Sequence, residues 1–270
     1  MSLTASRLRI KLGALLGRGT AFSPVVGSPF GEDALIAQLA ADSNAKRVCV
    51  DIGAHDGITM SNSFKLFRSG WTGLAIELDE QRFGELKKLH RGRDIDLKQA
   101  KVTPENVNAI LRGGGIPSDF GVLSLDIDGY DFYVLEAILA NFRPAVICTE
   151  INERIPPPLR FALKYSDDYE CDGGACYGQS ISKVEQLCAQ CNYSIVRLIC
   201  NNVILMPSEI APTSLSAKAA YVEGFAEMPD RKERFPNDGW EPVASMGTPA
   251  ARHFIEQEFA YRAGEYILED

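Results

Sequence analysis

Short apolar runs alternate with amphipathic stretches over most of this chain, and this alternation constrains its fold more than any other feature. Seven runs have the length and composition of buried strands: residues 48–52, 73–78, 96–102, 121–127, 145–151, 193–200 and 203–206. The first five are separated from one another by helical patterns, so we expect parallel pairing through right-handed crossovers. The last two are joined only by Asn201 and Asn202, which tolerate a positive φ and predict a tight hairpin.

This order predicts an α/β fold of the class I methyltransferase type, with a seven-stranded Rossmann-like sheet and an antiparallel hairpin at its end. A plain dinucleotide-binding fold would continue the strand–helix rhythm instead. We expect an N-terminal arm and helix at 1–46, an α/β core at 47–207 with a lid loop at 152–180, and a C-terminal helical extension at 208–270. The lid is expected because irregular connections of that length often cover or bind ligands.

Composition limits the class of protein and its partners. The chain has 270 residues, a formal net charge of −8 and seven cysteines. The acidic balance argues against nucleic acid as a partner. An odd cysteine count, with Cys49 and Cys148 inside apolar strands, favours a reducing cytoplasm over a disulfide framework. No apolar run reaches the roughly 18 residues of a membrane helix, so no integral membrane segment is expected.

Four further cysteines permit a zinc interpretation. Cys171 and Cys176 form one pair, and Cys188 and Cys191 form a C-x-x-C pair. The second pair falls inside a predicted helix, and the first has a gap at the outer edge of zinc-ligand spacing. Ordinary thiols are therefore the expectation.

The first candidate site follows the run at 48–52, in the sequence VCVDIGAHDG. Asp51 stands at the carboxyl end of that strand, and Gly53, Ala54 and Gly57 form a turn in which a ligand can approach the backbone closely. Twenty residues after Gly57, the next strand ends in Glu77, at the distance suited to a carboxylate that holds a ribose hydroxyl. Together these residues predict an adenosyl cofactor whose methionine-like amino group bonds to Asp51. The alternative is a tight strand–helix turn without a ligand.

His55 lies in the same turn. It is a candidate contact to the cofactor carboxylate or a candidate general base. A solvent-facing loop histidine is the alternative.

Carboxylates are concentrated after two neighbouring predicted strands. LSLDIDGYD contains Asp126, Asp128 and Asp131, and the later TEIN places Glu150 and Asn152 on one face of its strand. Adjacent strand tips converge in an open α/β sheet, so Asp128, Glu150 and Asn152 form a candidate site for Mg²⁺ or Mn²⁺, or for substrate hydroxyls and amines. Asp128 and Glu150 are also candidate catalytic residues. The alternative role of these groups is helix capping and loop hydrogen bonding.

The expected lid at 152–180 ends in YGQS. Tyr177 and Gln179 are candidate substrate contacts, because they lie at the end of this loop. Ser180 is a candidate N-cap of the following helix.

At these residues the chain resembles the FkbM-type methyltransferases. The resemblance covers about residues 47–206 and is carried by VDIGAHDG, KVTPENVNAIL, LSLDIDGYDFYVLEAI, RPAVICTEINERIPPP and YGQSISKVEQL. It implies S-adenosylmethionine as the cofactor and methyl transfer, commonly to hydroxyls of natural products or saccharides. It assigns Asp51, Gly53 and Gly57 to the cofactor turn, Glu77 to the ribose, and Asp126 and Asp128 to the junction of cofactor and substrate.

We therefore expect a cytoplasmic S-adenosylmethionine-dependent methyltransferase that acts on a hydroxyl of a sugar or another polar small molecule. Whether it acts as a monomer or a homo-oligomer stays open. Two other functions stay open. Asp126 and Asp128 also resemble the D-x-D motif of metal-dependent glycosyltransferases, although that function leaves the turn after Asp51 without a role. The third is a non-catalytic scaffold that binds the cofactor and docks a partner through its C-terminal region.

Overall fold

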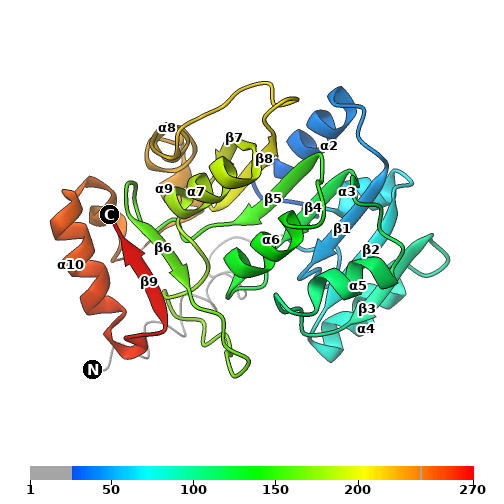
Figure 1. Ribbon diagram of the computed structural model, residues 1–270, viewed down its shortest axis with the longest axis horizontal. Coiled ribbons are helices and arrows are strands. Elements are labelled where there is room, and N and C mark those ends of the chain that lie inside the picture. The colour runs from blue at the N-terminus through cyan, green and yellow to red at the C-terminus, as the bar shows by residue number, and fades with distance from the viewer. Residues whose placement is uncertain (1–25, 238) are drawn as a thin grey trace.

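A computed structural model of the protein describes residues 26–237 and 239–270, and the first 25 residues of the predicted N-terminal arm lie outside this part. Its main sheet has seven strands in the order β3-β2-β1-β4-β5-β8-β7, with helices on both faces (Figure 1). The strands are β1 Val48–Ile52, β2 Thr72–Glu77, β3 Ile95–Gln99, β4 Val122–Leu125, β5 Val146–Glu150, β7 Tyr193–Ile199 and β8 Asn202–Pro207.

Strand directions in this sheet confirm the predicted class I methyltransferase fold. β3, β2, β1, β4 and β5 are parallel, and β8 runs antiparallel to both of its neighbours, β5 and β7. The predicted hairpin forms and inserts its second strand next to β5, but its turn consists of Cys200 and Asn201, and the positive φ, of 54°, is at Cys200. As a result, the carboxyl ends of the five parallel strands share one edge of the sheet.

Six helices belong to the core: α2 Glu32–Asp42, α3 Phe64–Arg68, α4 Glu80–Leu89, α5 Val107–Gly113, α6 Asp131–Leu139 and α7 Ile181–Cys191. Capping residues begin α4 and α7, where the side chains of Asp79 and Ser180 accept main-chain N–H bonds. α5 begins at Val107, three residues after Pro104. Thr103 and Asn106 bond to each other's main chain there and form a turn ahead of the helix.

Strand side chains alternate between two apolar layers on the two faces of the sheet. Val50 and Leu123 belong to one layer, whereas Cys49 and Cys148 belong to the other. Burial raises the pKa of both thiols well above the usual value, as expected of cysteines that act as small hydrophobes. Cys188 and Cys176 lie in two different hydrophobic clusters, which argues against a shared zinc site.

The 152–180 segment is more ordered than the irregular lid loop that we expect from the sequence. It contains β6, Arg160–Leu163, which pairs antiparallel with the C-terminal strand β9, Tyr266–Glu269. Ser180 and Gly178 also bond to the main chain of β6. The expectation of an irregular loop is wrong because the partner strand of β6 lies about a hundred residues later in the chain, and no local sequence pattern predicts the pairing.

The C-terminal extension is helical as predicted, but it also contributes β9. Its elements are α8 Ala217–Tyr221, a π-helix at Val222–Ala226, α9 Arg231–Arg234, a 3-10 helix at Glu241–Ser245, α10 Thr248–Glu258 and a 3-10 helix at Ala260–Arg262. Phe161 of β6 packs with Ile255 and Phe259 in a third hydrophobic cluster. Figure 1 shows β6, β9 and α10 together at the end of the molecule farthest from β2 and β3.

None of the helices within residues 26–237 and 239–270 is both long enough and apolar enough to cross a membrane.

Candidate functional site

The Glu77 carboxylate occupies a fixed position at the tip of β2. One oxygen accepts the main-chain N–H of His55 at 2.7 Å, and the other accepts that of Asp79 at 2.7 Å. His55 belongs to the turn after β1, so this one carboxylate joins two neighbouring strand tips. A carboxylate oxygen has more than one acceptor position, and both oxygens therefore keep capacity for a second donor. The side chain is half-buried and suited to accept a pair of hydroxyl groups.

The turn after β1 is held against β2 and β4. The N–H groups of Gly53 and Ala54 both donate to the carbonyl of Ile76, at 3.0 and 2.9 Å. Gly53 has a φ of 86°, and a Cβ at this position would lie 1.7 Å from the main-chain oxygen of Asp126. Only glycine fits there, because both the backbone conformation and the contact with β4 exclude a side chain.

Gly57 has a different neighbour. Its φ is 77°, and a Cβ there would lie 2.7 Å from both Leu86 and Leu89 of α4. The absence of a side chain at Gly57 therefore allows the turn to pack closely on α4. Its assignment to the cofactor stays a prediction.

Asp51 is buried in β1, directly beneath this turn. Its Oδ2 accepts a hydrogen bond from the hydroxyl of Ser63. Burial raises the pKa of Asp51 to about 6, and repulsion from Glu77 adds to this, although hydrogen bonds from Ser63 and Ser124 oppose it. Asp51 and Glu77 are therefore neighbours at one edge, as the sequence analysis expects.

His55 lies on the same half of the edge. Its backbone has a φ of 52°, and its half-exposed imidazole places Nδ1 at 3.6 Å from Asp56 Oδ1. Asp56 in turn accepts the N–H groups of Ile58 and Thr59, at 2.8 and 2.7 Å, and so fixes the turn. The structure thus joins His55 to Glu77 through its main chain, on the side expected for the cofactor.

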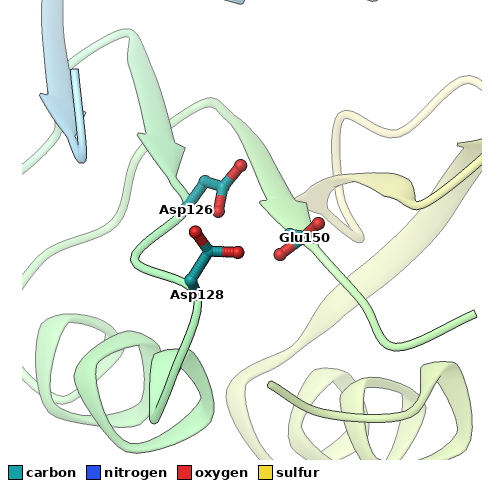
Figure 2. Close-up of side chains that lie close together, drawn as sticks. All are labelled: Asp126, Asp128 and Glu150. Atoms are coloured by element: carbon teal, nitrogen blue, oxygen red, sulfur yellow. The ribbon is translucent and has the colours of Figure 1, made fainter. Parts of the chain in front are cut away.

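Three carboxylates converge at the tips of β4 and β5. Asp126 and Asp128 follow β4 and Glu150 ends β5, and Figure 2 shows them facing a common space. One oxygen from each lies within 4.8 Å of the others, the arrangement required for a shared metal ion. Within residues 26–237 and 239–270, no other set of three or more Asp, Glu, His or Cys side chains has this geometry. We call Asp126, Asp128 and Glu150 the acidic cluster.

Mutual repulsion in the acidic cluster favours a bound proton or cation. Part of the Asp126 side chain is accessible to solvent, but protein atoms surround its carboxylate closely. Desolvation by these atoms is the larger cause, and repulsion from Asp128 and Asp131 the smaller, of a pKa raised to about 8. Burial and the neighbouring carboxylates also raise the pKa of Glu150 well above its usual value. At neutral pH the pair Asp126–Glu150 therefore retains a proton that a metal ion would displace.

Asp131 shapes the turn that presents Asp128. Its two carboxylate oxygens accept the N–H groups of Ile127 at 2.8 Å and Gly129 at 2.9 Å, on either side of Asp128. From the sequence, Asp131 is expected to cap the following helix. In the structure it is the first residue of α6, the N-cap position is Tyr130, and the carboxylate bonds back to the turn.

Asn201 is a site residue that sequence reasoning missed. Its Nδ2 donates to Oε1 of Glu150 at 2.6 Å, and its carbonyl accepts the N–H of Ile151 at 2.7 Å. The available signal is the hairpin itself, because its turn lies beside the tip of β5 once β8 pairs with β5. Asn201 therefore orients the Glu150 carboxylate.

Asn152 has a different role from the predicted metal ligand. It is fully buried, and its Nδ2 donates to the carbonyls of Ala175 at 2.8 Å and Tyr177 at 3.0 Å. Its Oδ1 accepts the main-chain N–H of Arg154 at 3.3 Å. Because buried polar groups require such partners, the carboxamide is committed to holding the 152–180 segment.

The two predicted substrate contacts are also engaged within the protein. Gln179 is fully buried, and its Nε2 donates to the carbonyl of Glu150 at 3.1 Å. The Tyr177 hydroxyl donates to Glu153 Oε2 at 3.1 Å and accepts from Arg154 at 3.1 Å. Gln179 thus contacts the β5 tip through Nε2, and its contact with substrate stays a prediction.

No protein-family model and no curated protein matches this chain. Among solved structures, it is similar to an O-methyltransferase from Bacillus cereus in complex with S-adenosylhomocysteine, at 16% identity and a TM-score of 0.46, over 74% of this chain and 88% of that one. A putative O-methyltransferase from Klebsiella pneumoniae aligns at 14% identity and a TM-score of 0.46, over 73% and 94% of the two chains. An amino pentose methyltransferase from Micromonospora echinaspora, with bound S-adenosylmethionine, aligns at 11% identity and a TM-score of 0.41, over 73% and 96%. At these identities, function has to be argued from the residues of this chain.

Proposed function

We propose that the protein is an S-adenosylmethionine-dependent methyltransferase that methylates a hydroxyl of a sugar or another polar small molecule, in the manner of the FkbM-type enzymes that it resembles in sequence. The observation that carries the proposal is the Glu77 carboxylate, held by the N–H groups of His55 and Asp79 at the tip of β2. Two fixed acceptor oxygens suit the two hydroxyls of an adenosine ribose.

Asp51 supports the other end of such a cofactor. It lies under the turn at the tip of the adjacent strand, where an ionised carboxylate attracts an ammonium group. With its pKa near 6, Asp51 is mostly ionised at neutral pH. Asp51 and Glu77 thus suit the two polar ends of a nucleoside joined to an amino acid.

The acidic cluster suits the acceptor half of the reaction. S-adenosylmethionine supplies an electrophilic methyl carbon, and the sulfur keeps the electron pair of the bond that breaks. The protein has to align the acceptor oxygen with that carbon and remove the hydroxyl proton. Without a bound cation, Asp126, whose pKa is raised to about 8, provides a base with a pKa close to working pH, which is the favourable range for proton transfer.

We extend the proposal to a divalent cation at the acidic cluster. The residues present fit Mg²⁺ or Mn²⁺, because all three donors are hard carboxylate oxygens within 4.8 Å of one another. Asp126, Asp128 and Glu150 would hold the ion, and Asn152 is not among its ligands. A cation there would supply a lowered pKa for an acceptor hydroxyl.

The glycosyltransferase alternative explains Asp126 and Asp128 but gives the Glu77 arrangement no role, so we do not adopt it. No observation favours a non-catalytic scaffold over an enzyme.

Isothermal titration of the protein with S-adenosylhomocysteine tests the proposal. We expect binding with a Kd of about 1–100 μM, in the usual range for a metabolic cofactor. Release of S-adenosylhomocysteine from S-adenosylmethionine in the presence of a panel of sugars and polyols then tests the acceptor class. Absence of S-adenosylhomocysteine binding, together with Mn²⁺-dependent binding of a nucleotide sugar, would replace this function with glycosyl transfer.

A further inference from the structure

The acidic cluster depends on an unusual backbone conformation at Asp128. Its φ is 54°, in the left-handed region that residues other than glycine rarely adopt. Such a conformation persists only when its surroundings hold it. Asp131 supplies part of this support from the side of the core, through the N–H groups of Ile127 and Gly129.

Tyr169 of the 152–180 segment supplies a second support, from outside the core. Its hydroxyl donates to the main-chain oxygen of Asp128 at 2.8 Å. Its ring lies against the α-carbon of Gly129, where a Cβ would be 2.7 Å from Tyr169 Cε1. The ring also makes an edge contact with Tyr130, with 5.8 Å between centroids. Tyr169 therefore contacts three consecutive residues of the turn that presents Asp128.

Arg262 connects Tyr169 to the C-terminal extension. Its guanidinium carbon lies 5.2 Å from the centroid of the Tyr169 ring, which is the geometry of a cation–π contact. Two ion pairs fix the guanidinium: with Asp172 at 2.9 Å and with Glu265 at 2.8 Å. The side chain is only 13% exposed, so the contact is shielded from solvent.

We infer that Tyr169 and Arg262 are positioning residues for the acidic cluster: Arg262 holds the Tyr169 ring, and the Tyr169 hydroxyl holds the turn that directs Asp128 toward Asp126 and Glu150. The inference rests on the proposed function, because that function is what makes the acidic cluster part of an active site. It assigns the C-terminal extension a role in the acceptor half of the site.

Hydrogen–deuterium exchange tests the first link without any substrate. Tyr169→Phe keeps the ring and removes only the hydroxyl, and we expect exchange in the peptide 123–132 to become about two- to tenfold faster, as follows from the loss of one hydrogen bond. Tyr165→Phe is the matched control, because its hydroxyl bonds to Asp167 and its ring also packs on Tyr130. Equal exchange in the two variants would overturn the inference.

A double substitution tests the second link. Arg262→Met should accelerate exchange in the same peptide, but it should add little in a Tyr169→Phe background, because both residues act through one bond. Arg252→Met is the control: this arginine pairs with Asp270 in the same extension. Full additivity of the two substitutions would show that Arg262 does not act through Tyr169.

Ligand binding separates positioning from general loosening. We expect Tyr169→Phe to weaken the binding of Mn²⁺ alone by about two- to tenfold and to leave the Kd of S-adenosylhomocysteine unchanged. An equal loss for both ligands would overturn positioning of the acceptor half. Failure of the unmodified protein to bind S-adenosylhomocysteine would instead count against the proposed function, and the exchange experiment would still decide the inference.

Discussion

Replacement of Asp126 by asparagine is expected to stabilise the protein while it removes the function of the acidic cluster. Asparagine keeps the shape of the side chain, can donate to Glu150, and removes one of three charges whose oxygens lie within 4.8 Å of one another. One pair of charges at that distance repels by about 3.5 kcal/mol at an effective dielectric of 20 and by about 0.9 kcal/mol in water. Because Asp126 is solvent-accessible, screening favours the lower end, and we expect a gain of about 1–2 kcal/mol.

This gain has a defined dependence on pH. The native pKa of Asp126 is about 8, against an ordinary value of 3.8 for aspartate, so between these two pH values the native state binds more protons than the unfolded state. Stability of the unmodified protein therefore falls as pH rises through this window. Asparagine does not titrate. The stability of the Asp126→Asn variant relative to the unmodified protein should therefore increase from about pH 4 to about pH 8 and then level off.

Thermal melts in the presence of a chelator measure the effect. At about pH 8.5 we expect Tm to rise by about 2–8 °C, and at about pH 6 by less. Asp131→Asn is the control with the opposite sign, because Asp131 accepts two N–H groups and its loss leaves a donor without an acceptor. If Asp126→Asn fails to stabilise at the higher pH, or stabilises more at the lower pH, the electrostatic account of the cluster is wrong.

Three further changes have defined outcomes. Glu77→Gln should weaken the binding of S-adenosylhomocysteine by about 10- to 100-fold in isothermal titration. The substitution removes a charged acceptor and turns a side-chain NH₂ group toward a main-chain N–H group. Gly53→Ala should prevent accumulation of folded protein in circular dichroism and solubility assays, since its Cβ would lie 1.7 Å from the Asp126 oxygen. Asn201→Ala should weaken Mn²⁺ binding about tenfold in titration calorimetry, because Glu150 loses its donor at 2.6 Å.

Each change has a control in the same part of the chain. Glu80→Gln alters a neighbouring acidic residue on α4 and should leave S-adenosylhomocysteine binding unaffected. Gly92→Ala also has a positive φ, of 76°, but nothing lies within 4 Å of its Cβ, so it should fold. Asn202→Ala removes a bond to Glu32 from the same hairpin and should lower Tm without a selective loss of Mn²⁺. The prediction for Glu77 is wrong if affinity stays within twofold.

The main sheet and two members of the acidic cluster could be predicted from sequence because they depend on local periodicity and on strand order. Apolar runs located every strand of the main sheet, and the Asn201 hairpin implied the antiparallel neighbour of β5. Once β4 and β5 are adjacent, the residues that follow them must meet. Asp128 and Glu150 converge for this reason, whereas Asp126 stands in the cluster where Asn152 was predicted.

The parts that were missed depend on contacts between distant residues. β6 is four residues long and finds its partner β9 at the other end of the described chain, so neither strand carries a clear local signal. Asn152 has the chemistry of a ligand contact, but burial commits it to main-chain partners. Which polar side chains face a ligand is decided by the packing of the 152–180 segment, and sequence pattern does not specify that packing.

The close contact between Gly53 and Asp126 has a consequence for how such a protein can diversify. With no room between these two strand tips, the turn after β1 and the start of the acidic cluster form one inflexible frame, so variation among such proteins has to arise elsewhere. Tyr169 packs against both the main core cluster and the cluster built with the C-terminal helices, and so joins the two. Exchanging the C-terminal cluster between homologues is therefore expected to change the surroundings of Asp128 while it leaves the contact between Gly53 and Asp126 intact.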